Sequence, residues 1–316
     1  GEPGYGAAVK YGQGTKSSNI QYDNLSRITE YTDFFGNQYH YGYDELTRPA
    51  VVQYPNGILT EYGYDSKGRL GGITHKRETG EILRSFAYQY DKNMNITKIT
   101  NEDGSLTDYI YDEWNRLTGE IWKNSLGMTT LDIVYSFQTA GTDQYGDTGN
   151  ICSKTVTRNG GTAETTTFTY DEYNKLITVQ HPGYITETLT YNANRQLTLS
   201  TKTAGGGGGS ETTKYYWNDQ GFLTKVLLPS GEPVEYKYDG VGRLVGRKDA
   251  NGEQIFVQAG WSIMTEQDTK GRRTYYTGSS SQSNNGTEGA NFFLFNHRGD
   301  TVLITDQTGE VSNSLH

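Results

Sequence analysis

The feature that most constrains this fold is a seven-residue pattern, beginning Tyr-Asp, that recurs along most of the chain. Its clearest copy runs from Tyr64 and Asp65 through Gly68 and Arg69 to Leu70. Ten copies begin at positions 22, 43, 64, 90, 111, 145, 170, 191, 217 and 238, and five of the nine spacings are 21 residues. A fixed period of this length indicates a repeat array, in which each unit packs mainly against its neighbours.

Each position of the heptad has its own predicted role. The aromatic residue contributes its ring to a ladder of side chains along a sheet. The Asp carboxylate accepts the backbone N–H two residues later, and Gly or Asn at the fifth position tolerates positive φ. Arg at the sixth position pairs with the Asp or lies on a Tyr ring. The structural residues so assigned are Tyr22, Asp23, Tyr43, Asp44, Tyr64, Asp65, Gly68, Arg69, Tyr90, Asp91, Tyr111, Asp112, Arg116, Tyr170, Asp171, Tyr191, Trp217, Gly221, Tyr238, Asp239, Gly242 and Arg243.

A second turn separates consecutive heptads, for example at Asn56-Gly57 and Ser230-Gly231. Two turns in each repeat leave strands of about six to eight residues, which is an ordinary strand length. The mean hydropathy of −0.75 would suggest disorder, but 26 Tyr residues supply rings that pack while their hydroxyls stay hydrogen-bonded. We therefore predict an all-β chain of repeated antiparallel hairpins in a long coiled sheet, with almost no helix.

Three places interrupt the period. The interval of 34 residues after Tyr111 holds a longer hairpin at 123–130 and a loop at 140–146. The Gly-rich run 205–210 falls at a second-turn tip, and its flexible-linker composition is interpreted as an engineered replacement of a natural loop. Residues 278–289 read as a mobile loop. The predicted organisation is an N-terminal arm or entering strand at 1–19, the array at 20–250 and a closing segment at 251–316.

The closing segment is predicted to consist of strands and turns. Residues 255–277 read as a strand containing Trp261, the turn Thr269-Lys270-Gly271, and a further strand at 272–276. The final stretch, Phe292–Val311, alternates an apolar strand, a turn, an apolar strand and a turn.

The heptad over residues 20–250 and the stretch Phe295–Val311 together resemble the YD-repeat, or Rhs, proteins. These include bacterial polymorphic toxins, wall-associated proteins, the C component of insecticidal toxin complexes, and animal teneurins. The resemblance implies a hollow β-shell, which encloses a toxic C-terminal domain in the bacterial members and supports adhesion in teneurins. The self-cleavage motif and toxin of that family do not match any part of this sequence. The expectation is a C-proximal part of such a shell.

Composition narrows the function classes. The net charge of −9 argues against nucleic-acid and anionic-lipid partners, and no apolar run of 18 residues predicts a membrane span. The lone Cys152 excludes an internal disulfide, and the five histidines lack metal-ligand spacing. Turns at 101–104 and 142–147 are rich in oxygen ligands but lack a calcium-loop pattern. We predict no enzymatic activity, no cofactor and no metal.

Two function hypotheses remain. The first is a structural shell segment of a secreted or surface-delivered toxin of interbacterial competition, whose partners are a C-terminal toxin cargo or other shell segments. The second is a cell-surface adhesion or carbohydrate-binding module, in which exposed Tyr and Trp rings stack on cell-wall glycan. The sequence favours the first, because the aromatic residues carry most of the apolar area available for packing.

Overall fold

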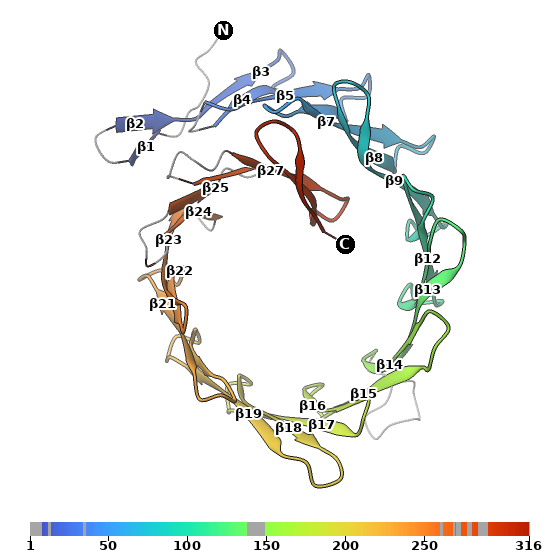
Figure 1. The fold of residues 1–316 in the computed structure, drawn as a ribbon, viewed down its shortest axis with the longest axis vertical. Coiled ribbons are helices and arrows are strands. Elements are labelled where there is room, and N and C mark those ends of the chain that lie inside the picture. The colour runs from blue at the N-terminus through green and yellow to red at the C-terminus, as the bar shows by residue number, and fades with distance from the viewer. Residues whose placement is uncertain are drawn as a thin grey trace. The chain divides into compact units, whose positions relative to one another are not determined.

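The computed structural model describes residues 8–11, 14–33, 36–137, 149–259, 262–267, 269, 273–276, 280–283 and 290–315. Within these ranges every regular element is a β-strand, as predicted (Figure 1). The chain divides into two compact units, which are described separately. Unit 1 comprises residues 1–104 and 272–316, and unit 2 comprises residues 105–271.

Unit 1 contains strands from both ends of the chain. Consecutive strands pair antiparallel from β3 to β10, from β25 to β29, and between β1 and β2. Its strands are β1 (Ala8–Tyr11), β2 (Gly14–Ser17), β3 (Asn19–Tyr22), β4 (Ile28–Thr32), β5 (Gln38–Tyr43), β6 (Pro49–Gln53), β7 (Ile58–Tyr64), β8 (Leu70–Arg77), β9 (Ile82–Tyr90), β10 (Ile96–Asn101), β25 (Arg273–Tyr276), β26 (Ser280–Ser283), β27 (Asn291–Phe295), β28 (Thr301–Thr305) and β29 (Val311–Ser314).

Unit 2 is a run of antiparallel hairpins in which each strand from β11 to β24 pairs with the next one along the chain. Its strands are β11 (Leu106–Tyr111), β12 (Leu117–Lys123), β13 (Thr129–Phe137), β14 (Ile151–Arg158), β15 (Glu164–Tyr170), β16 (Leu176–His181), β17 (Ile185–Tyr191), β18 (Leu197–Ala204), β19 (Ser210–Trp217), β20 (Leu223–Leu227), β21 (Pro233–Tyr238), β22 (Leu244–Asp249), β23 (Gly252–Ala259) and β24 (Ser262–Gln267).

A β-bulge follows the heptad turn in repeat after repeat. In the β7–β8 hairpin, Tyr64 pairs with Leu70 while Gly63 pairs with Gly72, so Gly71 is the extra residue. The same register shift accompanies the first-position aromatic residue in β3, β5, β11, β15, β17, β19 and β21. A bulge of this kind bends the strand and increases its twist. Each repeat therefore carries the same local distortion at the same heptad position.

The structure corrects three of the sequence assignments. Phe137, which pairs with Ile151 across the same register shift, takes the place predicted for Tyr145, a residue outside the described ranges. Residues 280–283, predicted as part of a mobile loop, form strand β26. The single strand predicted to contain Trp261 is replaced by two antiparallel strands, since β23 pairs with β24, and Trp261 itself lies outside the described residues. The pattern missed the first of these points because an insertion inside a turn shifts the apparent start of a heptad.

Two interruptions lie where the sequence places them. The turn after β12 spans 124–128, so this hairpin is the longer one predicted there. The Gly-rich run joins β18 to β19 at a hairpin tip, with Thr203 paired to Ser210 and positive φ at Gly206 and Gly207. Whether this run replaces a natural loop stays a prediction.

Candidate functional site

The heptad turn is a closed set of hydrogen bonds centred on the Asp carboxylate. In the copy at Tyr64, Asp65 Oδ1 accepts the N–H groups of Lys67 and Arg69, both at 2.9 Å. Its Oδ2 accepts Arg69 Nε–H at 2.7 Å. Because both carboxylate oxygens and the backbone donors are paired, the turn is fixed by interactions within the heptad.

Other copies repeat this geometry. The Asp accepts two backbone N–H groups at Asp23, Asp44, Asp91, Asp112, Asp171 and Asp239, and Asn192 and Asn218 do the same. The side-chain hydrogen bond from Arg48 lowers the pKa of Asp44 below its ordinary value, and Arg27 has the same effect on Asp23. The turn thus favours the ionised carboxylate.

The fifth position adopts positive φ even where the residue is not Gly. Gly68 and Gly242 have φ of 82° and 86°. The sequence anticipates Gly and Asn here, but Ser26, Thr47, Met94 and Arg195 are also left-handed, with φ between 61° and 69°. This conformation costs a residue that carries a Cβ about 1–2 kcal/mol. The carboxylate or amide hydrogen bonds therefore impose the turn, whatever residue occupies its fifth position.

Neighbouring repeats are joined by a second set of contacts, called here the inter-repeat contact. The hydroxyl of Tyr64 donates to the carbonyl of Pro49, the seventh residue of the preceding heptad, at 2.8 Å. Arg48 of that heptad lies over the Tyr64 ring, 3.9 Å from its centroid. Equivalent hydrogen bonds join Tyr43 to Ile28, Tyr90 to Leu70, Tyr170 to Ile151, Tyr191 to Leu176, Trp217 to Leu197 and Tyr238 to Leu223.

The chain covers these rings in three ways. Arg27, Arg48 and Arg69 lie over the next ring at 3.9–4.5 Å. Lys175 keeps the ion pair with its turn Asp but lies 5.5 Å from the Tyr191 ring. At the last array repeat Phe222 replaces the cation and stacks on Tyr238 with centroids 5.0 Å apart. These five ladder rings, Tyr43, Tyr64, Tyr90, Tyr191 and Tyr238, are therefore capped, whereas Tyr22 at the start of the array is 47% exposed.

The end of the chain reuses the same turn. Asn296 Oδ1 accepts the N–H groups of Arg298 and Asp300, and Asp306 Oδ1 accepts those of Thr308 and Glu310. Strands β27, β28 and β29 thus form two hairpins built by the rules of the array. They are called here the C-terminal hairpins, residues 291–314. Figure 1 shows them beside β5, β7 and β8, the strands that they contact within unit 1.

The C-terminal hairpins pack on an apolar surface of β5–β9, called here the docking face. Phe292, Leu294 and Leu303 are 2%, 0% and 3% exposed. They form one core cluster with Tyr39, Tyr54, Ile58 and Ala290. A second cluster packs Val302 against Ile73, Phe86 and Tyr88. Burial of side chains this size contributes about 1.5–3 kcal/mol each, so these contacts dominate the docking.

A buried polar contact joins the two surfaces between these clusters. His75 of β8 is 0% exposed and Thr60 of β7 is 2% exposed. The Thr60 hydroxyl is 2.8 Å from His75 Nδ1, and the carbonyl oxygen of Phe295 is 3.0 Å from Nε2. A carbonyl oxygen only accepts, so Nε2 carries the proton and Nδ1 accepts from Thr60. Burial lowers the pKa of His75 to about 4.

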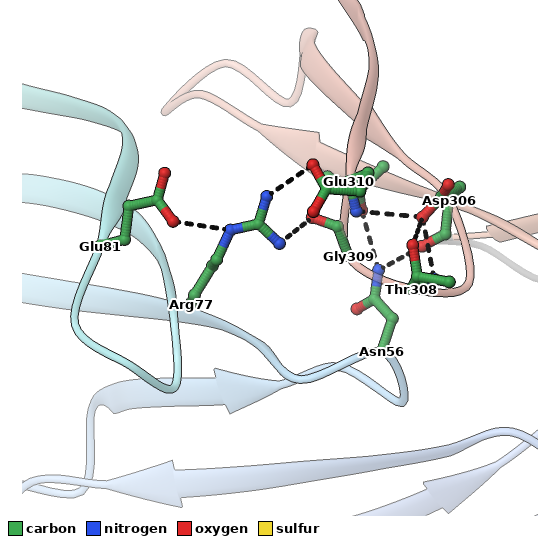
Figure 2. A network of polar contacts seen from close by, with 8 residues as sticks. Asn56, Arg77, Glu81, Asp306, Thr308, Gly309 and Glu310 are labelled. Carbon is green, nitrogen blue, oxygen red and sulfur yellow. Dashed lines mark hydrogen bonds and ion pairs between the residues drawn. The ribbon is translucent and has the colours of Figure 1, made fainter.

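The rim of the docking face is polar (Figure 2). Asn56 Nδ2–H donates to Thr305 Oγ1 at 2.9 Å and to the Asp306 carbonyl at 2.8 Å. Arg77 donates to the Gly309 carbonyl at 2.7 Å and pairs with Glu310 at 3.1 Å. These hydrogen bonds fix the register of the C-terminal hairpins, because they engage backbone carbonyls at defined positions.

The docking residues of β8 were not predicted from the sequence. Ile73, His75 and Arg77 alternate along one face of this strand, and all three contact the C-terminal hairpins. The period-two spacing from the apolar Ile73 is the signal that would have placed His75 on a buried face. Where the structure describes the side chains, His, Cys, Asp and Glu form no group of three that could hold a metal ion.

Hydrogen bonds from the ring of one heptad to a carbonyl of the preceding heptad join the repeats into a sheet, as a YD-repeat array requires. Family comparisons agree: residues 90–121 match the RHS Repeat and residues 144–258 match the Teneurin YD-shell. The resemblance recognised from the heptad is thereby confirmed. A comparison with curated proteins found no match.

Solved structures show the same fold. The crystal structure described as TcdB2-TccC3-TEV matches with a TM-score of 0.50 and 13% identity, over 96% of this chain and 21% of that chain. The crystal structure of TcdB2-TccC3 matches with a TM-score of 0.51 and 14% identity, over 95% of this chain and 18% of that chain. This chain thus spans about a fifth of the length of the proteins it matches. The all-β YD-repeat shell fold predicted from the heptad is confirmed.

Proposed function

We propose that this chain is a wall segment of a protein shell that encloses and carries a toxin cargo encoded C-terminal to it. The observation that carries the proposal is the docking of the C-terminal hairpins on β5–β9, through two core clusters and hydrogen bonds to backbone carbonyls. This docking holds the C-terminal hairpins against strands β5–β9 of the same chain. A cargo continuing from that point would be held against the wall from its first residues.

The polar composition of the wall supports this role. The net charge is −9, and the ladder rings of Tyr64, Tyr191 and Tyr238 are covered by Arg48, Lys175 and Phe222. Capped rings present less apolar area to a partly folded cargo than bare rings would. The matched families are shell and repeat families, which favours a structural role over an enzymatic one. Delivery to a target cell and secretion from a bacterium belong to the same proposal. The described residues form no helix with the length and apolarity to cross a membrane.

Protease protection tests the enclosure. A short protease-recognition peptide is placed after His316 in one variant and before Gly1 in another, and the cleavage rates are compared with that of the free peptide. Enclosure predicts that the peptide after His316 is cleaved more slowly than the peptide before Gly1. Leu294→Asp, which puts a charge into the docking core, is expected to remove the difference. Equal cleavage of both peptides in the unaltered chain contradicts the proposal.

A second candidate is binding of cell-wall or cell-surface glycan. Trp114 and Tyr173, at heptad turns, are 65% and 58% exposed, and Tyr184 at another hairpin tip is 84% exposed. Arg116 lies 4.7 Å from the Trp114 ring centroid and Arg195 lies 5.5 Å from that of Tyr173, so a sugar would stack on the remaining exposed face of each ring. A glycan array with the purified chain tests the candidate. Binding that is lost in Trp114→Ala or Tyr173→Ala, at unchanged thermal stability, would favour it over the shell.

A further inference from the structure

His75 differs from the other histidines whose burial the structure describes. It is 0% exposed, whereas His40 lies on the surface and His181 and His297 are partly buried. Both of its ring nitrogens are engaged, and one of the partners is a backbone carbonyl 220 residues away. It therefore forms a buried hydrogen-bonded bridge between the docking face and the C-terminal hairpins.

This bridge requires the neutral imidazole. In the neutral ring Nδ1 accepts from Thr60 and Nε2–H donates to Phe295. A second proton on Nδ1 would turn that nitrogen into a donor, so the Thr60 hydroxyl would have to give up its own donation to the ring. The new charge would also be closed off from water, because Thr60 is itself 2% exposed. Burying an unpaired charge is far more costly than burying a neutral hydrogen-bonded group.

The charged groups around His75 do not supply a partner for an imidazolium. On β9, Arg84 stands directly opposite His75 in the register, and its positive charge opposes protonation. Glu102, after β10, acts in the other direction, but its carboxylate is paired with Arg84 at 3.2 Å and with the backbone N–H of Ser85 at 2.8 Å.

The remaining titratable neighbours bring no compensating charge. Tyr54, from the turn before β7, stays a neutral phenol because burial raises its pKa. His297, after β27, packs edge-on against Tyr88 with centroids 4.8 Å apart, and burial lowers its pKa as well. Burial and the charge of Arg84 therefore outweigh the Phe295 carbonyl and Glu102, which act in the opposite direction, so the ring of His75 stays neutral as long as the hairpins are docked.

We propose that protonation of His75 weakens the docking of the C-terminal hairpins on β5–β9, so that acid releases this segment from its own sheet. When the hairpins are undocked, His75 is in water and binds a proton with an ordinary pKa of about 6.5. The docked state binds the proton poorly, because burial holds the pKa of His75 at about 4. Docking is therefore at full strength above pH 6.5 and weakens as the pH falls towards 4. The opening equilibrium should rise by about 20-fold between pH 7 and pH 5.

Hydrogen exchange on the full chain tests the release. The amides of residues 291–305 are followed by mass spectrometry at pH 7 and pH 5, after correction for the intrinsic exchange rate. We expect about 20-fold more opening at pH 5. Peptides from β16–β18 in unit 2 provide the internal reference and should change much less. His75→Gln keeps an acceptor for Thr60 and a donor for Phe295 but does not titrate, so the pH dependence should disappear in this variant.

The control variant is His181→Gln, which removes a partly exposed histidine that contacts Glu187 in unit 2. It should keep the pH dependence of residues 291–305. A dependence that persists in His75→Gln, or is absent from the unaltered chain, overturns the proposal. Should His75→Gln fail to fold, NMR titration of the unaltered chain decides instead. A His75 ring that stays neutral down to about pH 5 supports the proposal, and one that titrates near 6.5 while the hairpins are docked contradicts it.

Discussion

Strands β5–β9 of unit 1 and β14–β22 of unit 2 are built from the same heptad but differ in burial. The first group carries two apolar core clusters because the C-terminal hairpins pack on it. In the second group most side chains are partly buried, and the buried apolar residues are Val179 and Val234. The turns and inter-repeat contacts are nevertheless equivalent in both. The heptad alone thus builds an ordered sheet, and a separate segment supplies the core.

Truncating one leucine of the C-terminal hairpins and one of unit 2 tests this difference most strongly. Leu294→Ala, at a fully buried position of β27, should lower the free energy of unfolding by about 2–5 kcal/mol. Leu199→Ala, at a partly buried position of β18, should cost about 1 kcal/mol. Urea denaturation of the two variants measures the difference. Equal losses would mean that the hairpins add no core of their own.

The fifth heptad position offers the next largest effect. Gly68→Ala should cost about 1–2 kcal/mol, since φ is 82° and a Cβ would stand 3.5 Å from Arg48 Nη1. Gly242→Ala should cost more, because its Cβ would meet the Phe222 ring. Gly240→Ala is the matched control, with nothing within 4 Å of the added Cβ. Thermal melts of the three variants rank their losses of stability. A loss in Gly240→Ala as large as that in Gly242→Ala would contradict the expected order.

Removal of a ladder hydroxyl should destabilise the two units equally, unlike the leucine truncations. Tyr64→Phe and Tyr238→Phe each delete a hydrogen bond to a carbonyl, at 2.8 and 2.9 Å. Each should cost about 0.5–1.5 kcal/mol, and the two losses should be similar because the inter-repeat contact is the same in both units. Tyr173→Phe, at an exposed turn position, should be neutral. Unfolding free energies of the three variants provide the measurement, and a large excess at Tyr64 would refute the equivalence.

The smallest expected effect is the loss of stability at low pH when the heptad Asp residues are protonated. The Arg48 hydrogen bond lowers the pKa of Asp44 in the folded chain. The contribution of Asp44 to the free energy of unfolding is therefore complete above pH 3.8, and it declines as the pH falls through the lower folded-state pKa. Asp44→Asn should flatten this part of the pH profile in unit 1, as Asp239→Asn should in unit 2. Melting temperatures recorded between pH 5 and pH 2 test both variants. The same profiles are recorded in the His75→Gln background, because the His75 transition extends to about pH 4 and overlaps this window.

The strands, turns and short-range contacts of each repeat follow from the sequence alone. Asp65 reaches Arg69 four residues away, and Tyr64 reaches Pro49 fifteen residues away. Contacts this short follow from turn chemistry and period-two alternation, so the strands, the turns and the YD fold were predictable. The positions missed, such as Phe137 in place of Tyr145, lie where an insertion breaks the period.

The segment that covers the docking face is known only from the folded structure. His75 meets Phe295 across 220 residues and Asn56 meets Asp306 across 250 residues. Alternation shows that a side chain is on a buried face, but it does not name the segment that buries it. The docking depends on how bulges and twist accumulate over many strands, and no single heptad encodes that sum. The apolar runs of β27 and β28 were therefore visible in the sequence, while their partner on β5–β9 was not.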